Sequence, residues 1–322
     1  MRRRIRHRGA ITLAIGIPAV LLIVAAYGLS GGFKSAPQPG GASGQAGPKA
    51  PPVRPGLNIG VYEPAPTPAL KTVQEFGTAI GQQPDLLLTY SEWNTPFQKG
   101  IAWSAYGMHM TLIDQMEPKN ISIQAIADGK YDGYLRMYAD SVMKFGHPII
   151  IGFGHEMNGN WYSWGRGQVR ASTFIAAWRH VVTVFRHQHV DNVTWLWTVA
   201  HAATGLRQYW PGPNYVSKVG IDGYFERPGD SFASIFGVTL KAIRKFTSDP
   251  VLIAETAAGP RTDHQAKDVR RLFAGVEKDR LTGLVWFNKA QRDLLRQLGE
   301  TMHIENKPTS RSLLGKMKDL FS

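Results

Sequence analysis

The stretch PIIIGFGHEMNGNWYSWG, residues 148–165, places an ionisable pair directly after a run of apolar residues. PIIIGF has the composition of a buried β-strand, and His155 and Glu156 follow where such a strand ends. The carboxyl ends of parallel strands are where barrel and open-sheet enzymes bind their ligands. The stretch therefore predicts a functional site at a strand end, provided that the rest of the chain forms a parallel sheet.

Seven other segments have the same short apolar or β-branched character, namely 57–62, 85–90, 110–114, 193–199, 219–225, 250–255 and 281–287. Most are apolar on both faces, which is typical of buried parallel strands and not of a half-exposed antiparallel sheet. Segments with helical i, i+3, i+4 periodicity lie between them, at 174–185, 232–243 and 269–276.

Eight strands that alternate with helices within about 250 residues predict a closed (β/α)8 barrel, the TIM-barrel architecture of the α/β class. An open doubly wound sheet is the alternative. That fold uses a glycine-rich phosphate-binding turn after its first strand, and GVYEPAP at 60–66 is not such a turn. We therefore expect residues 57–302 to form one barrel.

The N-terminal part differs in composition from the rest. Residues 1–9 contain five arginines, and residues 10–29 carry no charge. Twenty helical residues span about 30 Å, which predicts a transmembrane signal anchor with its basic end in the cytoplasm. Signal cleavage near Ala26, giving a secreted protein, is the alternative. Residues 30–56 are rich in Gly and Pro and predict a disordered linker, and the tail 303–322 has no readable role.

The formal net charge of +13 is concentrated at the N-terminus. Residues 1–55 contain eight Lys or Arg and no acidic residue, which leaves +5 (29 basic minus 24 acidic) for residues 56–322. Because no basic run with interleaved aromatic residues follows, nucleic-acid binding is not expected. Cysteine is absent, which excludes disulfides, thiolate metal sites and a cysteine nucleophile.

The polar residues that follow the predicted strands are mostly carboxylates and aromatic rings. Glu156 and Glu255 follow the fourth and seventh strands, so a closed barrel would direct both toward one mouth. Glycosidic bond cleavage needs such a pair, one carboxyl protonated and the other ionised, and two like charges in a desolvated site resist simultaneous ionisation. The other residues at such positions are Glu63, residues 90–93, Gln115, Glu117, His201, Tyr224, Glu226, Trp286 and Asn288.

His155 and Glu156 also begin the zinc-protease signature, but Gly159 stands where that signature needs its second histidine. No metal and no cofactor are therefore expected. Tryptophan rings can stack on the apolar C–H faces of sugars. Among the nine tryptophans, Trp161 and Trp286 lie where such stacking would matter.

Several segments together resemble glycoside hydrolase family 26, which contains mannanase and β-glucanase barrels. They are GKYDGYLRMYADSVMKFGHPIIIGFGHEMNGNWYSWG (129–165), VGIDGYF, PVLIAETA and GLVWFN, and the resemblance covers roughly residues 57–300. It implies a retaining, two-step mechanism with Glu156 as acid/base and Glu255 as nucleophile.

The resemblance also implies roles for four neighbours of the carboxylates. Tyr224 would bond the nucleophile, Trp161 and Trp286 would face the sugar, and His155 matches the histidine before the acid. Two departures concern the part of the cleft that binds the cleaved sugar. Gly152 stands where many members have an arginine, and DQMEP (114–118) replaces a histidine that is common after the third strand in the mannanases.

We therefore expect a monomeric, membrane-tethered endo-β-glycanase whose catalytic domain lies outside the cytoplasm and whose partner is a polysaccharide. Family frequency favours β-1,4-mannan. A β-1,3/1,4-glucanase, another β-glycanase acting on an exopolysaccharide, and a non-catalytic membrane-tethered barrel that binds polysaccharide are the alternatives.

Overall fold

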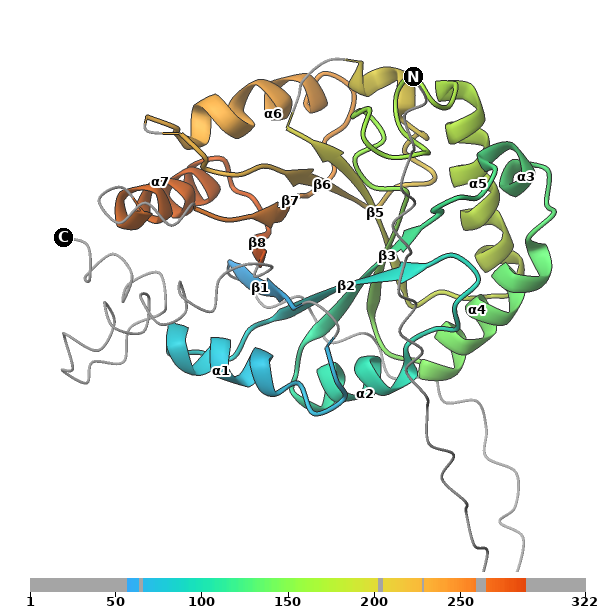
Figure 1. Cartoon of the computed structure of the whole chain (residues 1–322), viewed down its shortest axis with the longest axis horizontal. Helices are drawn as coiled ribbons and strands as arrows, with labels where there is room; N and C mark the ends of the chain where they lie inside the picture. The colour runs from blue at the N-terminus through green and yellow to red at the C-terminus, as the bar shows by residue number, and fades with distance from the viewer. Residues whose placement is uncertain (1–56, 64–65, 202–204, 228, 259–264, 288–322) are drawn as a thin grey trace, which may run out of the picture. The chain divides into compact units, whose positions relative to one another are not determined.

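The computed structural model describes residues 57–63, 66–201, 205–227, 229–258 and 265–287 (Figure 1). The elements are, in order, β1 (Asn58–Tyr62), α1 (Lys71–Ile80), β2 (Leu86–Glu92), α2 (Lys99–Gly107), β3 (Thr111–Glu117), α3 (Ile123–Ala127), α4 (Asp132–Phe145), β4 (Ile149–Phe153), α5 (Ala171–His187), β5 (Val193–Ala200), the 3-10 helix η1 (Leu206–Tyr209), β6 (Lys218–Asp222), the π-helix η2 (Ala233–Gly237), α6 (Val238–Ile243), β7 (Val251–Thr256), α7 (Gln265–Lys278) and β8 (Gly283–Phe287).

The eight strands form one closed parallel sheet. Each strand pairs with the next along the chain, and β8 pairs with β1 in register from Asn58↔Gly283 to Tyr62↔Phe287. The helices lie around the outside of the strands (Figure 1). The predicted (β/α)8 barrel is confirmed, and the open sheet is excluded because both of its edges would have to be free.

The predicted segments 1–9, 10–29, 30–56 and 303–322 lie outside the described residues, as does the end of the predicted barrel after residue 287. Within the part of the chain that is described, no helix combines the length and the apolar composition needed to cross a membrane.

All eight predicted strands are present, and the largest changes at their carboxyl ends are those of β3 and β6. β3 continues to Glu117, beyond the predicted end at residue 114, because Gln115, Met116 and Glu117 pair with β2. β6 ends at Asp222, so Tyr224 lies in the loop after the strand. Both changes place polar side chains at the end of the barrel where the sequence predicts the site.

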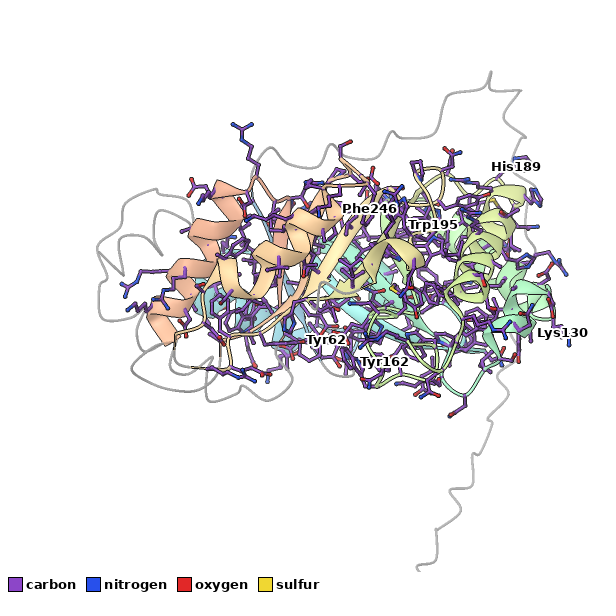
Figure 2. The ribbon with its side chains drawn as sticks, turned by 90° about the horizontal axis from the view of Figure 1, so that it is seen from above. Tyr62, Lys130, Tyr162, His189, Trp195 and Phe246 are labelled. Atoms are coloured by element: carbon purple, nitrogen blue, oxygen red, sulfur yellow. The ribbon has the colours of Figure 1, made fainter. Side chains whose placement is uncertain are left out.

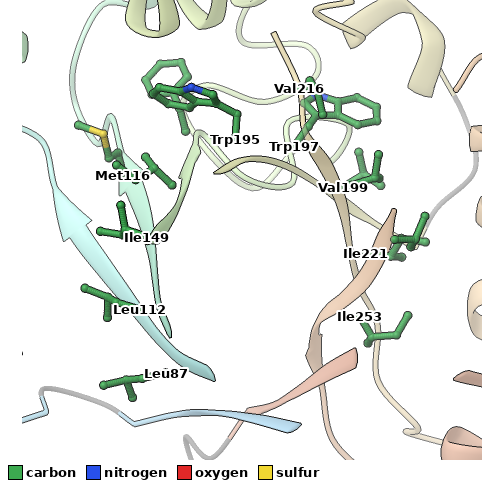
Figure 3. Packing of buried hydrophobic residues seen from close by; sticks show 14 of the residues in the cluster. Leu87, Leu112, Met116, Ile149, Trp195, Trp197, Val199, Val216, Ile221 and Ile253 are labelled. Carbon is green, nitrogen blue, oxygen red and sulfur yellow. The ribbon is translucent and has the colours of Figure 1, made fainter. Parts of the chain in front are cut away.

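Two hydrophobic layers result from the alternation of side chains along each strand. A small cluster fills the inside of the barrel and consists of Leu86, Leu88, Ile113, Ile150, Leu196, Leu252, Ala254 and Val285. A larger cluster packs the outer faces of the strands against the helices, and Figure 3 shows part of it, including Leu87, Leu112 and Ile149. The filled interior leaves the ends of the barrel as the places where ligands can bind.

The two ends of the barrel can be told apart in Figure 2. Tyr62, the last residue of β1, and Tyr162, in the loop after β4, lie on one side of the molecule. His189, which precedes β5, and Phe246, which precedes β7, lie on the other. We call the first end, formed by the carboxyl ends of the strands, the mouth.

Candidate active site

The segment after β4 continues the hydrogen bonding of the barrel beyond the last residue of the strand. The N–H of Gly154 donates to the carbonyl oxygen of Met116 on β3 over 3.0 Å. The N–H of Glu156 donates to the carbonyl oxygen of Thr198 on β5 over 2.9 Å. Glu156 has a left-handed φ of 54°, which costs a non-glycine residue about 1–2 kcal/mol. The backbone bond to β5 holds Glu156 in this conformation at the mouth.

Asn158 and Trp164 fix the remainder of this loop. The Asn158 amide donates to the carbonyl oxygen of Ala200 over 3.0 Å and accepts from its N–H over 2.9 Å. The indole N–H of Trp164 donates to the carbonyl oxygen of His155 over 2.8 Å. All four residues are buried, so losing any of these bonds would leave a polar group without a partner. The loop is therefore a rigid support for Glu156.

Trp161 lies beside the carboxyl group of Glu156. Its indole N–H donates to Oε2 of Glu156 over 2.7 Å, and 56% of the residue is exposed. The ring covers Gly159, where a Cβ atom would lie only 2.3 Å from the ring. The absence of a side chain at Gly159 thus allows the ring to reach the carboxyl group. The structure brings the predicted pair Glu156 and Trp161 together.

His155 points into the protein, under the loop. Its Nε2 lies 3.1 Å from the hydroxyl of Tyr162, whose ring stacks on Trp164 at 4.3 Å and 7°. Burial, together with the positive charge of Lys119, lowers the pKa of His155 to about 3, so the imidazole is neutral. Its partner is Tyr162, and Nδ1 has no hydrogen-bond partner within the described chain. His155 supports the loop from below.

A bulge in β7 turns Glu255 toward the mouth. Ala254 faces the barrel interior, so regular alternation would direct Glu255 to the outside. The register against β6 shifts at this point, because Ile221 is opposite Ile253 while Asp222 is opposite Glu255. The extra residue resets the alternation.

Two tyrosine hydroxyls hold the carboxyl group of Glu255. The hydroxyl of Tyr90, on β2, donates to Oε1, and the hydroxyl of Tyr224, after β6, donates to Oε2. Burial raises the pKa of Glu255 to about 7, the charge of Glu156 adds to this rise, and the two hydroxyls partly oppose it. Donors at both oxygens favour the ionised form. The predicted hydrogen bond from Tyr224 to Glu255 is present, and Tyr90 on β2 donates a second hydrogen bond to the other carboxyl oxygen.

Asp222 lies next to Glu255 on the neighbouring strand and is also buried. Neither of its oxygens has a hydrogen-bond partner among the described residues. Burial raises the pKa of Asp222 well above its usual value, and the charges of Glu255 and Glu156 raise it further. Because hydroxyl donors reach Glu255 but not Asp222, we infer that Asp222 holds a proton and that Glu255 holds the charge.

Glu156 and Glu255 thus share one electrostatic environment at the mouth. Burial raises the pKa of Glu156, and the hydrogen bond from Trp161 partly opposes this. Both carboxylates act on the hydroxyls of Tyr162 and Tyr224, whose pKa values are raised mainly by burial and then by these charges. The pKa values of both carboxyls are raised, and what distinguishes them is that Glu255 accepts from two hydroxyls while Glu156 accepts from one indole N–H. Glycosidic bond cleavage requires one protonated and one ionised carboxyl, and the two hydroxyl donors favour Glu255 as the ionised one.

The aromatic rings at the mouth include one, Phe287, that the sequence analysis did not single out. Trp286 is only 5% exposed and lies on the face of β8 opposite to Val285, which points into the barrel. Phe287, one residue further, stacks on Tyr62 at 4.3 Å and 15°. The burial of Trp286 therefore does not support its predicted role as a sugar-facing ring, and strand alternation puts Phe287 in that direction instead.

The model of glycosyl hydrolase family 26 matches residues 90–258, which include both glutamates. The chain belongs to glycosyl hydrolase family 26. The match begins within β2, at Tyr90, and runs just past the end of β7, so it includes Glu156, Glu255 and both tyrosines that donate to Glu255. A second model, of the chaperone protein DnaJ C-terminal region, matches residues 290–322, which lie outside the described part.

Two curated relatives of this family 26 chain carry names of polysaccharide-degrading enzymes. Endoglucanase H of Acetivibrio thermocellus is 27% identical over 253 residues, which are 73% of this chain and 28% of that protein. A mannan endo-1,4-beta-mannosidase of Bacillus subtilis strain 168 is 26% identical over 194 residues, which are 56% of this chain and 50% of that protein. The matched parts thus make up half or less of these relatives.

Solved structures with the same fold include two further family 26 proteins. The Bacillus subtilis mannanase man26 superposes with a TM-score of 0.55 and 14% identity, covering 72% of this chain and 80% of that chain. A modular endo-beta-1,4-mannanase from Cellulomonas fimi gives a TM-score of 0.57 and 14% identity, covering 72% and 65%. At this identity, the likeness concerns the fold.

Gly152, where many family 26 members have an arginine, is explained by a neighbour on β3. A Cβ atom at position 152 would lie 1.8 Å from Oε1 of Gln115. Nε2 of Gln115 donates to the hydroxyl of Thr198 on β5 over 2.8 Å, so its side chain crosses above β4. Gln115 thus occupies the space that a longer side chain on β4 would need.

Sequence reasoning missed several residues of this family 26 site. Asp222 and Tyr62 end their strands, and Tyr162 belongs to the predicted loop, but no spacing signal distinguishes them. Tyr90 and Glu117 stood at inspected positions without a role. Glu117 is buried and its Oε2 lies 2.7 Å from Nζ of Lys119. In the described part of the chain, no three His, Asp or Glu residues are arranged to hold a metal ion.

Proposed function

We propose that the chain is an endo-acting β-glycanase that hydrolyses its substrate with net retention of anomeric configuration. The observation that carries the proposal is the pairing at the mouth of Glu255, held by two hydroxyl donors, with Glu156, whose pKa is raised by burial. The names of the curated relatives, an endoglucanase and mannan endo-1,4-beta-mannosidases, support the reaction class.

In the first step, an oxygen of Glu255 attacks the anomeric carbon, and the bond from that carbon to the leaving oxygen breaks. Glu156 gives its proton to the leaving oxygen, so the released chain carries a hydroxyl group. The hydroxyls of Tyr90 and Tyr224 orient the attacking carboxylate. Because both also stabilise its charge, they must release one oxygen as the covalent bond forms.

In the second step, Glu156 acts as a base and takes a proton from water. The water oxygen attacks the anomeric carbon, and the ester bond to Glu255 breaks. Glu156 is then protonated and Glu255 ionised, as at the start. The indole N–H of Trp161, which favours the ionised form of Glu156, assists this exchange of roles.

We propose β-1,4-mannan as the substrate, since three of the four most similar curated relatives are named for it. Endoglucanase H supports a β-glucan as the second candidate. Gln115 over Gly152 alters the part of the cleft that the resemblance assigns to the cleaved sugar, so activity should be compared on mannan, mixed-linkage β-glucan and β-1,3-xylan.

We further propose that residues 10–29 anchor the enzyme in the membrane with the barrel outside the cytoplasm. The support is the uncharged length of this segment and the five arginines before it. Full-length protein should pellet with membranes, and its barrel should be open to protease added from outside the cell. Recovery of the full-length chain in the soluble cytoplasmic fraction would refute this proposal.

The central test replaces the two carboxylates. Glu156→Ala and Glu255→Ala should each reduce hydrolysis by at least about a hundredfold while leaving thermal unfolding near that of the wild type. Proton NMR of the first product should detect the β-anomer. Full activity in either variant would reject the assignment, and an α-anomer would reject retention. Binding without hydrolysis by the wild type would instead favour the non-catalytic barrel.

A further inference from the structure

Trp103 is an exposed tryptophan that the active site does not explain. Among the tryptophans of the described residues, two are exposed, Trp161 with 56% and Trp103 with 49%. Trp161 belongs to the mouth, where it bonds Glu156. Trp103 lies on α2, which packs on the outside of the barrel. Exposing so large an apolar ring to water is unfavourable, so it suggests contact with a ligand.

The rings around Trp103 hold it in one orientation. Its ring meets those of Tyr106, Phe145 and His147 edge to face, at interplanar angles of 81–82°. Tyr106, itself exposed, stacks on His147 with centroids 3.6 Å apart at 13°. We call Trp103, Tyr106 and His147 the aromatic platform. Its exposed rings are fixed before any ligand arrives, which lowers the entropic cost of binding.

The aromatic platform lies at the end of the barrel opposite to the mouth. Trp103 and Tyr106 are in the second half of α2, which leads into the amino end of β3. His147 directly precedes β4, whereas Glu156 follows the carboxyl end of that strand. The five residues of β4 alone span about 16 Å. A ligand on the platform is thus outside the catalytic mouth.

The chemistry of the platform fits a neutral ligand with apolar faces and hydroxyl groups. The charged residue of the last turn of α4, which packs on the platform through Phe145, is paired with an opposite charge, since Nζ of Lys144 lies 2.8 Å from Oδ2 of Asp140. An anionic lipid surface would be met by unpaired lysines and arginines. The indole N–H, the tyrosine hydroxyl and the imidazole provide polar groups for sugar hydroxyls. Beside them, Gly107 has open space where a side chain would be.

We propose that the aromatic platform is a second, non-catalytic binding site for a neutral polysaccharide. The inference rests on the proposed function, because it assumes that the enzyme meets such a polymer. One stretch of a long polymer would stack on Trp103 and Tyr106 while another stretch enters the mouth. Two linked contacts raise the effective affinity for polymers but not for oligosaccharides too short to span both sites.

The experiment compares the wild type with Trp103→Ala, Trp103→Phe and Met137→Ala in the full-length chain. Met137 is the matched control, because it is 61% exposed on the outside of the barrel, on α4, but has no ring. Each substitution is also made in a Glu255→Ala background, so that binding to insoluble mannan, β-glucan and xylan can be measured without hydrolysis. Thermal unfolding of each variant verifies that it is folded.

Trp103→Ala should weaken binding to the insoluble polymer by about tenfold, the loss of roughly one ring contact, and Trp103→Phe by less. Both should keep the wild-type kcat/KM on a soluble hexasaccharide, and Met137→Ala should behave as the wild type in both assays. Equal polymer binding by Trp103→Ala and the wild type would overturn the proposal. The proposal would also be wrong if the chain that carries Glu255→Ala alone bound none of the three polymers.

Other occupants of the platform would give different results. If Trp103→Ala no longer sedimented with vesicles of anionic lipid but still bound the polymers, the platform would be a membrane contact and the inference would be wrong. If Trp103→Ala changed the oligomeric state but not polymer binding, the platform would bind a second copy of the chain and the inference would again be wrong. The inference and the proposed function fail separately: hydrolysis without an effect of Trp103→Ala rejects the inference, and Trp103-dependent binding without hydrolysis rejects the function.

Discussion

The indole N–H of Trp161 donates a hydrogen bond to Oε2 of Glu156 over 2.7 Å. This bond joins the exposed ring of the mouth to the carboxyl group proposed as acid and base. It stabilises the ionised form of Glu156, while burial favours the protonated form. The balance between the two sets the pH range in which Glu156 can donate a proton.

Trp161→Phe removes the N–H donor and keeps an aromatic ring. The pKa of Glu156 should rise, because the ionised form loses its donor. The basic limb of the kcat/KM profile, where the acid loses its proton, should therefore move to higher pH. An unchanged basic limb would show that Glu156 is not the group titrating there.

Tyr90→Phe and Tyr224→Phe each remove one hydroxyl donor from Glu255. The pKa of Glu255 should rise in both variants, since each hydroxyl lowers it in the wild type. Because the nucleophile must be ionised, the acidic limb of the pH profile should move to higher pH. One lost hydrogen bond to a charged group is worth about 1.5–3 kcal/mol, so kcat/KM should fall by about 10- to 100-fold.

Tyr215→Phe is the matched control for these two variants, because Tyr215 precedes β6 and so lies at the opposite end of the barrel. It should keep the wild-type profile. The proposed hydrogen bonding of the nucleophile would be contradicted if the acidic limb shifted in Tyr215→Phe. It would also be contradicted if the acidic limb stayed unchanged in both Tyr90→Phe and Tyr224→Phe.

Gly152→Ala should destabilise the barrel, because the new Cβ atom would lie 1.8 Å from Oε1 of Gln115 and push this side chain away from Thr198. We expect a loss of about 1–3 kcal/mol in the free energy of unfolding, measured by urea denaturation. In Gly152→Ala/Gln115→Ala the obstacle is absent, so the two effects should not add. Additive effects would exclude the contact as the cause.

Asp114→Asn tests a buried carboxyl that has no part in the proposed catalysis. Asp114 accepts hydrogen bonds from the hydroxyls of Tyr138 and Ser91, but burial dominates and raises its pKa to about 6. With a folded pKa above the unfolded value, its stabilising effect is complete below about pH 4 and is lost as pH rises through 6.

The asparagine cannot ionise, so this pH-dependent loss should be absent from the variant. Between pH 4 and pH 8, the free energy of unfolding of Asp114→Asn should therefore increase by about 3 kcal/mol relative to that of the wild type, which means that the variant becomes relatively more stable. Guanidinium denaturation at the two pH values measures this difference. If the difference in the free energy of unfolding between Asp114→Asn and the wild type were the same at both pH values, the raised pKa of Asp114 would be contradicted.

The α5 segment illustrates which predictions could be made locally. Its periodic residues Phe174, Trp178, Val181 and Phe185 are all buried in the structure, as the spacing indicated. Trp195 and Trp197 are likewise buried in β5. In such elements the side-chain period alone decides which face packs against the core. Neighbouring strands need not be known.

Position 286 illustrates a prediction that depends on more than the local sequence. The resemblance implied that Trp286 faces the sugar. In the structure Trp286 is buried, and the ring of Phe287 stacks on Tyr62 at the mouth. The direction of a side chain at a strand end depends on register with the neighbouring strands. The register of β8 with β1, from Asn58↔Gly283 onward, becomes visible only when the barrel closes.

The sequence by itself determined that eight apolar strands alternate with helices and that Glu156 and Glu255 follow the fourth and seventh of them. Apolar runs and helical periods are properties of neighbouring residues, so the chain records them directly. Only the tertiary structure decided that a bulge turns Glu255 inward, that Tyr90 reaches it across the barrel and that Gln115 covers Gly152. These relationships join residues far apart in sequence, and they exist only once strand pairing and closure have fixed which side chains share one space.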